Sequence, residues 1–171
     1  MNTRKLTETA LMVAIIAILS PLSIPLAGEV PISLATFTIM LAGVLLGPRQ
    51  AVICTALYLF IGAIGIPVFA QYTSGVGILF GVTGGFLFGY LPLAFFSGLF
   101  SKGKIRMFIG MFIGNAILYL FGIIWFMYVT QASLMTALLA CVIPFLPGDL
   151  LKIILVYLLA PRLQPIIHKN R

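Results

Sequence analysis

The sequence predicts an all-α integral membrane protein in which six transmembrane helices form one compact bundle with both termini on the inner side. Three observations favour this fold class. Of the 171 residues, 62% are hydrophobic and only 8% are charged, whereas a soluble domain carries about 25% charged residues. The mean hydropathy is +1.22. Long uncharged stretches also alternate with short polar segments. This pattern disfavours soluble enzymes, nucleic-acid-binding modules, coiled coils and disordered tails.

Six apolar stretches approach the length of about 20 residues that a helix needs to cross a bilayer. Gln50–Ser101 holds no charged residue but is too long for one helix, so it must fold back once, at the Pro- and Gly-rich segment Ile66–Gly77. The predicted spans are Thr9–Ala27, Leu34–Leu46 with its flanks, Ala51–Gly65, Ile78–Phe100, Met107–Val129 and Leu134–Ala160. We expect residues 1–171 to form a single transmembrane domain that binds a substrate.

The basic residues separate the two sides of this six-span arrangement. Nine of the ten lie in the termini and in the loops that share their side: Arg4, Lys5, Arg49, Lys102, Lys104, Arg106, Arg162, Lys169 and Arg171. The other loops hold no Lys or Arg, and the turn between the first two spans holds Glu29. The positive-inside rule therefore places both termini inside and predicts a multi-pass protein of the cell membrane. It also accounts for the net charge of +7 without a nucleic-acid partner.

The first span has one alternative interpretation, a cleavable signal peptide. Its basic start fits a signal peptide, but Glu8 comes early and the apolar stretch that follows is long. We therefore expect a retained transmembrane helix.

The sequence indicates no metal, cofactor or catalytic site. Cys54 and Cys141 lie inside apolar runs and are interpreted as buried hydrophobic residues, and His168 lies in a basic tail. The segment Gly98–Lys104 matches GxxxxGK, but Ile105 stands where a Ser or Thr would bind magnesium, and no strand precedes it. We expect neither ATP binding nor catalysis, so the chain has no visible energy source of its own.

The tenth basic residue, Lys152, lies inside the sixth span, three residues after Asp149. At this spacing the two side chains share one helical face. Each ionised group costs about 2.5–3.5 kcal/mol at the bilayer centre, so both should face the bundle interior or a wet cavity. Two interpretations remain: an ion pair that fixes helix packing, or a site for a polar ligand, which we favour because ionisable residues inside a membrane usually serve function.

The segment Pro144–Asp149 should interrupt the sixth span, because proline removes a backbone donor and clashes with the preceding turn. Asp149 would then lie near the positive N-terminal end of a new helical half, at a site reached from outside. Paired opposite charges suit a neutral ligand group that both donates and accepts hydrogen bonds, such as an amide or a urea.

Small residues suggest close helix contacts. GxxxG spacing occurs at Gly43/Gly47, Gly81/Gly85, Gly85/Gly89 and Gly110/Gly114, where helix packing is the main interpretation and ligand contact the alternative. Ala10 and Ala14, with Ala17 further along, form an alanine stripe on the first helix. That stripe either packs inside this protein or docks on a separate membrane subunit. Asn115 and Tyr119 lie one turn apart, and an Asn inside a span needs a polar partner.

Six motifs, which cover nearly the whole chain in order, carry a resemblance to a known family. They are PISLATF (Pro31–Phe37), LAGVLLGPRQA (Leu41–Ala51), YLFIGAIGIPVFA (Tyr58–Ala70), GVTGGFLFGY (Gly81–Tyr90), GNAILYLFG (Gly114–Gly122) and FLPGDLLK (Phe145–Lys152). With them the chain resembles the BioY family, the biotin-specific membrane subunits (S components) of energy-coupling factor (ECF) transporters.

The resemblance implies a biotin pocket that opens to the outside. Its candidate substrate-binding residues are Asp149, Lys152, Thr36, Phe69, Tyr72, Thr83, Gly84, Asn115 and Tyr119. The resemblance further implies that the alanine stripe docks on a transmembrane coupling subunit that carries two ATPases. Asp149 would accept from an N–H of the urea ring, and Lys152 would donate either to the ring carbonyl or to the valerate carboxylate. The resemblance implies no cofactor, and it implies a location in the bacterial plasma membrane.

The chain departs from the family pattern at three positions. Ala35 lies near a position where the family usually has Gln, and Val82 and Phe86 replace the Pro and Tyr of Gly-Pro-Thr-Gly-Gly-Tyr. Loss of the Gln amide and the Tyr hydroxyl is expected to weaken ligand hydrogen bonds. The alternatives are an S component for another vitamin, a stand-alone ion-coupled carrier and a small membrane enzyme.

Overall fold

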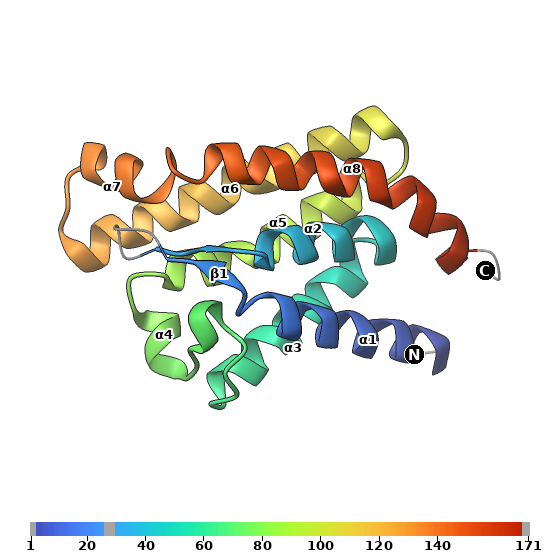
Figure 1. Ribbon diagram of the computed structural model, residues 1–171, viewed down its shortest axis with the longest axis horizontal. Helices are drawn as coiled ribbons and strands as arrows, with labels where there is room; N and C mark the ends of the chain where they lie inside the picture. The colour runs from blue at the N-terminus through green and yellow to red at the C-terminus, as the bar shows by residue number, and fades with distance from the viewer. Residues whose placement is uncertain (1–2, 26–29, 169–171) are drawn as a thin grey trace.

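The computed structural model describes residues 3–25 and 30–168, and these are mostly helical (Figure 1). The helices are α1 (Thr3–Leu19), α2 (Ala35–Leu46), α3 (Pro48–Ala63), α4 (Val76–Phe80), α5 (Gly84–Leu99), α6 (Lys104–Thr130), α7 (Leu134–Cys141) and α8 (Leu146–His168). A 3-10 turn, η1, covers Ala70–Tyr72. Two short strands, β1 (Ser23–Ile24) and β2 (Ile32–Ser33), pair antiparallel. The predicted helical class is therefore confirmed, with a small hairpin added.

The predicted first span is too long at its C-terminal end. Helix α1 ends at Leu19, and Ser23 pairs with Ser33 in the hairpin instead of continuing the helix. Pro21 is a physical reason for this stop, because a proline inside a helix removes a hydrogen bond and clashes with the preceding turn. The predicted end at Ala27 and the acidic turn at Glu29 lie outside the described residues, as do Lys169 and Arg171 of the tail.

The predicted fourth and sixth spans are each divided in two. Residues 81–83 separate α4 from α5, and residues 142–145 separate α7 from α8 with a bend of 45°. The interruption around Pro144 is thus confirmed. The third span begins earlier than predicted, because Pro48 occupies the first turn of α3, where its missing N–H is no loss.

By length and composition, one helix among the described residues could cross a membrane, or two if a bent pair of helices counts as one span. Helix α6 is long and apolar enough to cross a bilayer, and α7 with α8 passes the same test if the bent pair is one span. Helices α2, α3 and α5 are apolar but shorter. Six crossings are therefore not established by length alone.

Glycines bring α5 and α6 into close contact. A side chain at Gly85 or Gly89 of α5 would collide with α6, and one at Gly110 or Gly114 of α6 would collide with α5. Gly85 faces Trp125, whose indole N–H donates to the carbonyl of Gly81 at 2.9 Å. These GxxxG pairs therefore serve helix packing.

The connections of the bundle gather at two opposite ends. At one end Arg4 donates to the carbonyl of Ile167, so the start of α1 meets the end of α8. The α2–α3 junction, the α5–α6 connection and the last turns of α8 border one cavity of about 490 Å³ at this end. The hairpin, α4 and α7 lie at the other end (Figure 1). The sequence places the basic residues of the inner side in four segments: the N-terminus, two loops and the C-terminal tail. The described parts of these four segments lie at the end of the bundle where α1 begins and α8 ends.

Candidate functional site

A buried polar cluster surrounds Asp149 in the middle of the apolar bundle. Lys152 Nζ donates to Asp149 Oδ1 at 2.8 Å, to Thr36 Oγ1 at 2.9 Å and to the carbonyl of Ser33 at 2.7 Å. Thr36 Oγ1 donates to Asp149 Oδ1 at 3.2 Å, and Tyr119 Oη donates to Asp149 Oδ2 at 2.6 Å. Asp149 is 2% exposed and Lys152 is 7% exposed, so this cluster is withdrawn from the surface.

The polar groups of this cluster come from four elements: α8, β2, α2 and α6. Asp149 lies in the first turn of α8, where the helix dipole favours a carboxylate. Lys152 follows one turn later on the same face. Strand β2 presents the Ser33 carbonyl, and the Ser33 hydroxyl accepts from the backbone N–H of Ala35 at 3.2 Å, which orders the start of α2. Thr36 follows in that first turn, and Tyr119 approaches from α6.

Two adjacent hollows lie beside the cluster. The smaller has a volume of about 30 Å³ and is bordered by Thr36, Tyr119, Asp149 and Lys152, which leaves room for a water molecule or one ligand group. The larger has a volume of about 180 Å³. Four residues line both hollows and form the wall between them: Pro31, Ser33, Phe86 and Tyr90. Movement of this wall would join the two hollows into one pocket.

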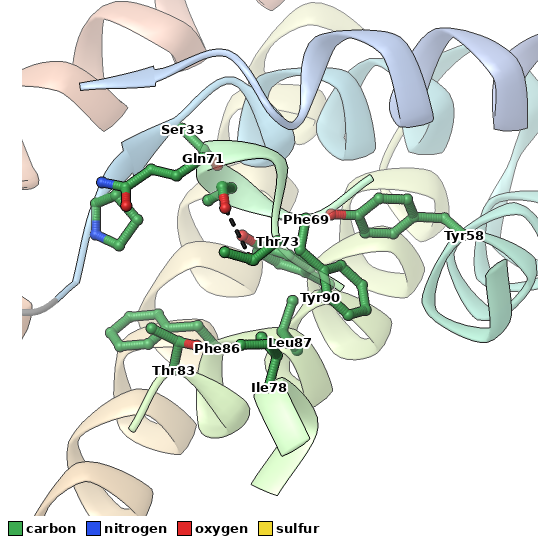
Figure 2. A pocket seen from close by; sticks show the side chains of 12 residues that line it. Ser33, Tyr58, Phe69, Gln71, Thr73, Ile78, Thr83, Phe86, Leu87 and Tyr90 are labelled. Atoms are coloured by element: carbon green, nitrogen blue, oxygen red, sulfur yellow. Dashed lines mark hydrogen bonds between the residues drawn. The ribbon is translucent and has the colours of Figure 1, made fainter. Parts of the chain in front are cut away.

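Aromatic and polar side chains surround the larger hollow. Figure 2 shows Gln71 and Thr73 on one side and Thr83 and Phe86 on the other. Phe69 is 1% exposed and meets the ring of Tyr58 edge-on, with centroids 5.7 Å apart. Such a lining suits a small, partly apolar ligand with a few polar groups.

A short segment around η1 covers the larger hollow. The backbone N–H of Gln71 donates to the carbonyl of Pro21 at 3.1 Å and to the hydroxyl of Ser23 at 3.0 Å. Gln71 and Tyr72 both have positive φ, which is uncommon for residues other than glycine. The Thr73 hydroxyl donates to the carbonyl of Ala70 at 2.8 Å, the dashed contact in Figure 2. These contacts tie the segment to the connection after α1.

The structure places six of the nine candidate residues at the borders of the two hollows. Thr36, Tyr119, Asp149 and Lys152 border the smaller hollow, and Phe69 and Thr83 border the larger. The other three do not line either hollow. Tyr72 is 64% exposed, Gly84 packs closely against Leu79 and Trp125, and Asn115 is buried in α6 with its Oδ1 unpartnered among the described residues.

Sequence reasoning did not single out Tyr58, Tyr90 or Ser33 as site residues, whereas Gln71 lies in the loop Phe69–Gly75 that the family resemblance implies would close or line the pocket. Tyr58 and Tyr90 carried a usable signal, because a buried tyrosine hydroxyl inside an apolar helix needs a polar partner. The Ser33 contribution is a backbone carbonyl, and no side-chain pattern marks such a group.

The predicted docking stripe lies partly on the surface. Ala10 and Ala14 are exposed on α1, and Ala17 is half-buried against the core. Ala10 and Ala14 are therefore accessible to another helix. As for metals, no group of three or more His, Cys, Asp and Glu side chains comes together among residues 3–25 and 30–168.

The sequence profile of the BioY family matches residues 1–169. The chain is 38% identical to the biotin transporter BioY2 of Lactococcus lactis, with 97% of this chain and 93% of that protein covered. It is 32% identical to the biotin transporter BioY of Thermotoga maritima, with 94% and 96% covered. Among solved structures, it resembles the S-component for biotin from an ECF-type ABC transporter, with a TM-score of 0.86, 32% identity, and 94% of this chain and 90% of that chain covered. The chain therefore belongs to the BioY family.

Proposed function

We propose that the protein is the biotin-binding S component of an ECF-type transporter, and that biotin occupies the two hollows beside Asp149. The observation that carries the proposal is the buried Asp149–Lys152 pair next to a hollow, in a chain whose relatives are named biotin transporters. A pair that only fixed helix packing would need no hollow beside it.

The hydrogen-bonding capacity of Asp149 favours a ring N–H as its ligand partner. An ionised carboxylate has about four acceptor sites, and Thr36, Tyr119 and Lys152 occupy three of them. One site is left for an N–H of the urea ring. Lys152 already uses its three donors, so a ligand acceptor would have to displace one of its present partners.

The rest of the ligand would extend into the larger hollow, against Phe69, Phe86 and Thr83. Pockets for small-molecule ligands usually have volumes of about 300 Å³ or more. The two hollows, of about 180 Å³ and 30 Å³, are smaller. Binding would therefore involve a shift of the wall between the hollows, which includes Phe86 and Tyr90, or of the segment around Gln71. The hydroxyl and backbone contacts that hold Gln71 to Ser23 and Pro21 are weak enough to exchange.

We infer that residues 1–171 act as one transmembrane substrate-binding domain with six crossings and both termini inside the plasma membrane. The crossings would be α1, α2, α3, α4–α5, α6 and α7–α8. The convergence of the α1 start, the α2–α3 junction, the α5–α6 connection and the α8 end supports this topology, because these are the segments that carry the inner positive charges. The vitamin site would then open outward.

Docking on an ATP-driven module would supply the energy. The exposed Ala10 and Ala14 of α1, with Ala17, would contact the transmembrane coupling subunit that carries the two ATPases. The chain itself would act as a carrier and not as an enzyme.

A competition titration tests the proposal. Detergent-purified protein is titrated with biotin, with biotin methyl ester, and with thiamine and riboflavin as unrelated vitamins. We expect biotin to bind in the nanomolar range, to be recovered unchanged, and to resist competition by the unrelated vitamins. Weaker binding of the methyl ester alone would assign the valerate carboxylate to Lys152, whereas equal binding would assign the ring carbonyl.

Transport supplies the second readout. Vesicles that contain this chain alone should bind biotin without accumulating it, and vesicles that also contain the coupling subunit and ATPases should accumulate it with ATP. Tight binding of another vitamin in place of biotin, or uptake by the chain alone, would contradict the proposal.

A further inference from the structure

An apolar groove lies between α6 and α8, away from the vitamin site. Its lining residues are Ile105, Phe108, Ile154, Tyr157 and Leu158, and its volume is about 430 Å³. Ile105 is 77% exposed and Leu158 is 59% exposed. The two helices run side by side in this part of the bundle (Figure 1). In a bilayer this groove would face hydrocarbon and would accept an extended apolar chain.

Positive charges stand at one end of this groove. Lys102, Lys104 and Arg106 border an adjoining hollow that shares Ile105 with the groove, and all three are exposed. On α8, Arg162 follows Leu158 by one helical turn and is also exposed. Because α6 begins where α8 ends, both helices contribute cations to the same end.

Among residues 3–25 and 30–168, no ion pair joins these cations to an acidic side chain. The sequence contains no Asp or Glu between residues 30 and 148, and none after Asp149. The ion pairs of the described residues are Arg4–Glu8 and Asp149–Lys152, neither of which involves the groove. An anionic group from outside the chain would therefore complement the charges at this end of the groove.

We propose that the α6–α8 groove binds an anionic phospholipid, with an acyl chain against Phe108, Ile154 and Leu158 and the headgroup phosphate at Lys104, Arg106 and Arg162. The combination of features favours a lipid over a protein partner: the apolar part lies along the helices, and the charges are confined to the end that would lie at the membrane surface. Basic pockets between helices at this level bind anionic headgroups. The proposal relies on the membrane placement proposed above but not on the vitamin site.

Lipid titration of the delipidated, detergent-purified protein tests this site. Native mass spectrometry would follow the binding of phosphatidylglycerol and of phosphatidylcholine with the same acyl chains. We expect one phosphatidylglycerol to bind at least roughly tenfold more tightly than phosphatidylcholine, because the basic residues attract its negatively charged headgroup. Free glycerol 3-phosphate, which has the headgroup chemistry without the chains, should not displace it.

Two variants separate the two parts of the groove. Lys104→Gln/Arg106→Gln should weaken phosphatidylglycerol binding about tenfold and leave phosphatidylcholine binding unchanged. Leu158→Trp should fill the groove and weaken both lipids. The matched controls are Lys5→Gln/Arg49→Gln, which removes the same charge from exposed residues elsewhere, and Leu120→Trp, at a similarly exposed position on α6. Both controls should bind lipid like the parent.

Biotin titration of every variant keeps this test separate from the vitamin site, since all of them should bind biotin like the parent. Equal binding of the two lipids by the parent would overturn the proposal, as would a control charge variant that loses phosphatidylglycerol equally. So would a Leu158→Trp protein that keeps its lipid but no longer assembles with the energising module, because the groove would then belong to a protein partner.

Discussion

Asp149 and Lys152 are tolerated inside the bundle because each other's charges, two hydroxyls and one backbone carbonyl occupy almost all of their hydrogen-bonding positions. Lys152 directs all three donors to Asp149, Thr36 and the Ser33 carbonyl. Hydrogen bonds to a charged group contribute about 1.5–3 kcal/mol each, which is comparable to the cost of about 2.5–3.5 kcal/mol for each ion at the bilayer centre. The pair is therefore stable before any ligand arrives.

Tyr119→Phe should lower the stability of the protein. The substitution removes the 2.6 Å hydrogen bond to Asp149 Oδ2, a loss of about 1.5–3 kcal/mol for a bond to a charged acceptor. The melting temperature of the detergent-purified protein should fall by several degrees. Tyr128→Phe is the matched control, because Tyr128 lies on the same helix and is 74% exposed. Equal melting temperatures for the two variants would show that the bond to Asp149 contributes nothing.

At the residue scale, the sequence was sufficient to predict the central pair and part of its surroundings. The spacing of Asp149 and Lys152 inside an apolar span implied one shared face, and the two side chains are indeed bonded at 2.8 Å. The Ser33 carbonyl could not be predicted, because its position depends on the pairing of β2 with β1. Tyr90 joins the wall between the hollows through packing of α5, which a linear pattern does not reveal.

At the scale of elements, helix ends were the least predictable feature. Proline gave a correct signal near Pro144, where the sixth span is interrupted, whereas the start of α3 at Pro48 was predicted three residues too late. The chain after Leu19 carries no charge until Glu29, so the absence of charge extended the predicted first helix through Pro21 and missed the hairpin. Pro92, Pro161 and Pro165, in contrast, lie inside helices, so proline alone does not decide where a helix ends.

The α5–α6 contact depends on the absence of side chains at its glycines. Gly85→Ala should destabilise the protein by about 1–3 kcal/mol, the usual effect of overpacking, because the new methyl group would meet Trp125 and the carbonyl of Phe121. Gly77→Ala is the control, since nothing lies within 4 Å of the added atom. Thermal unfolding in detergent measures both, and a Gly85→Ala protein as stable as the control would contradict this account of the packing.

A bulky substitution in the alanine stripe of α1 tests whether this stripe docks on the coupling subunit. Ala14→Trp should leave biotin binding unchanged, because Ala14 is exposed and borders neither hollow, but it should stop biotin uptake with the energising module. Leu120→Trp, on the exposed part of α6, provides the control and should transport normally. Loss of biotin binding in Ala14→Trp would instead assign the stripe to packing within the bundle.

At the scale of the whole molecule, the charge distribution and the geometry give the same division into two ends. The segments with basic residues meet around one cavity and through the Arg4–Ile167 contact. The hairpin and the segment around Gln71, which cover the larger hollow, lie at the other end (Figure 1). The positive-inside rule predicted this division because charge and loop order are linear properties of the chain.

Cysteine labelling in intact cells tests the proposed orientation. Cys54 and Cys141 are both buried, and their replacement by Ala gives a background without thiols. In that background Tyr72→Cys should react with a membrane-impermeant maleimide, because Tyr72 is exposed at the proposed outer end. Lys104→Cys should react only after the membrane is permeabilised. The reverse pattern would place the vitamin site on the inside.

The most direct test of the central claim is a biotin titration of the parent and of Asp149→Asn. The substituted amide removes the charge of the acceptor while Lys152 keeps its bonds to Ser33 and Thr36, so the protein should fold. We expect nanomolar binding by the parent and a loss of roughly 10-fold to 100-fold in Asp149→Asn, the equivalent of one charge-assisted hydrogen bond. Glu8→Gln makes the same change of charge at the opposite end and should bind like the parent. Undiminished biotin binding by Asp149→Asn would mean that the buried pair is not the vitamin site.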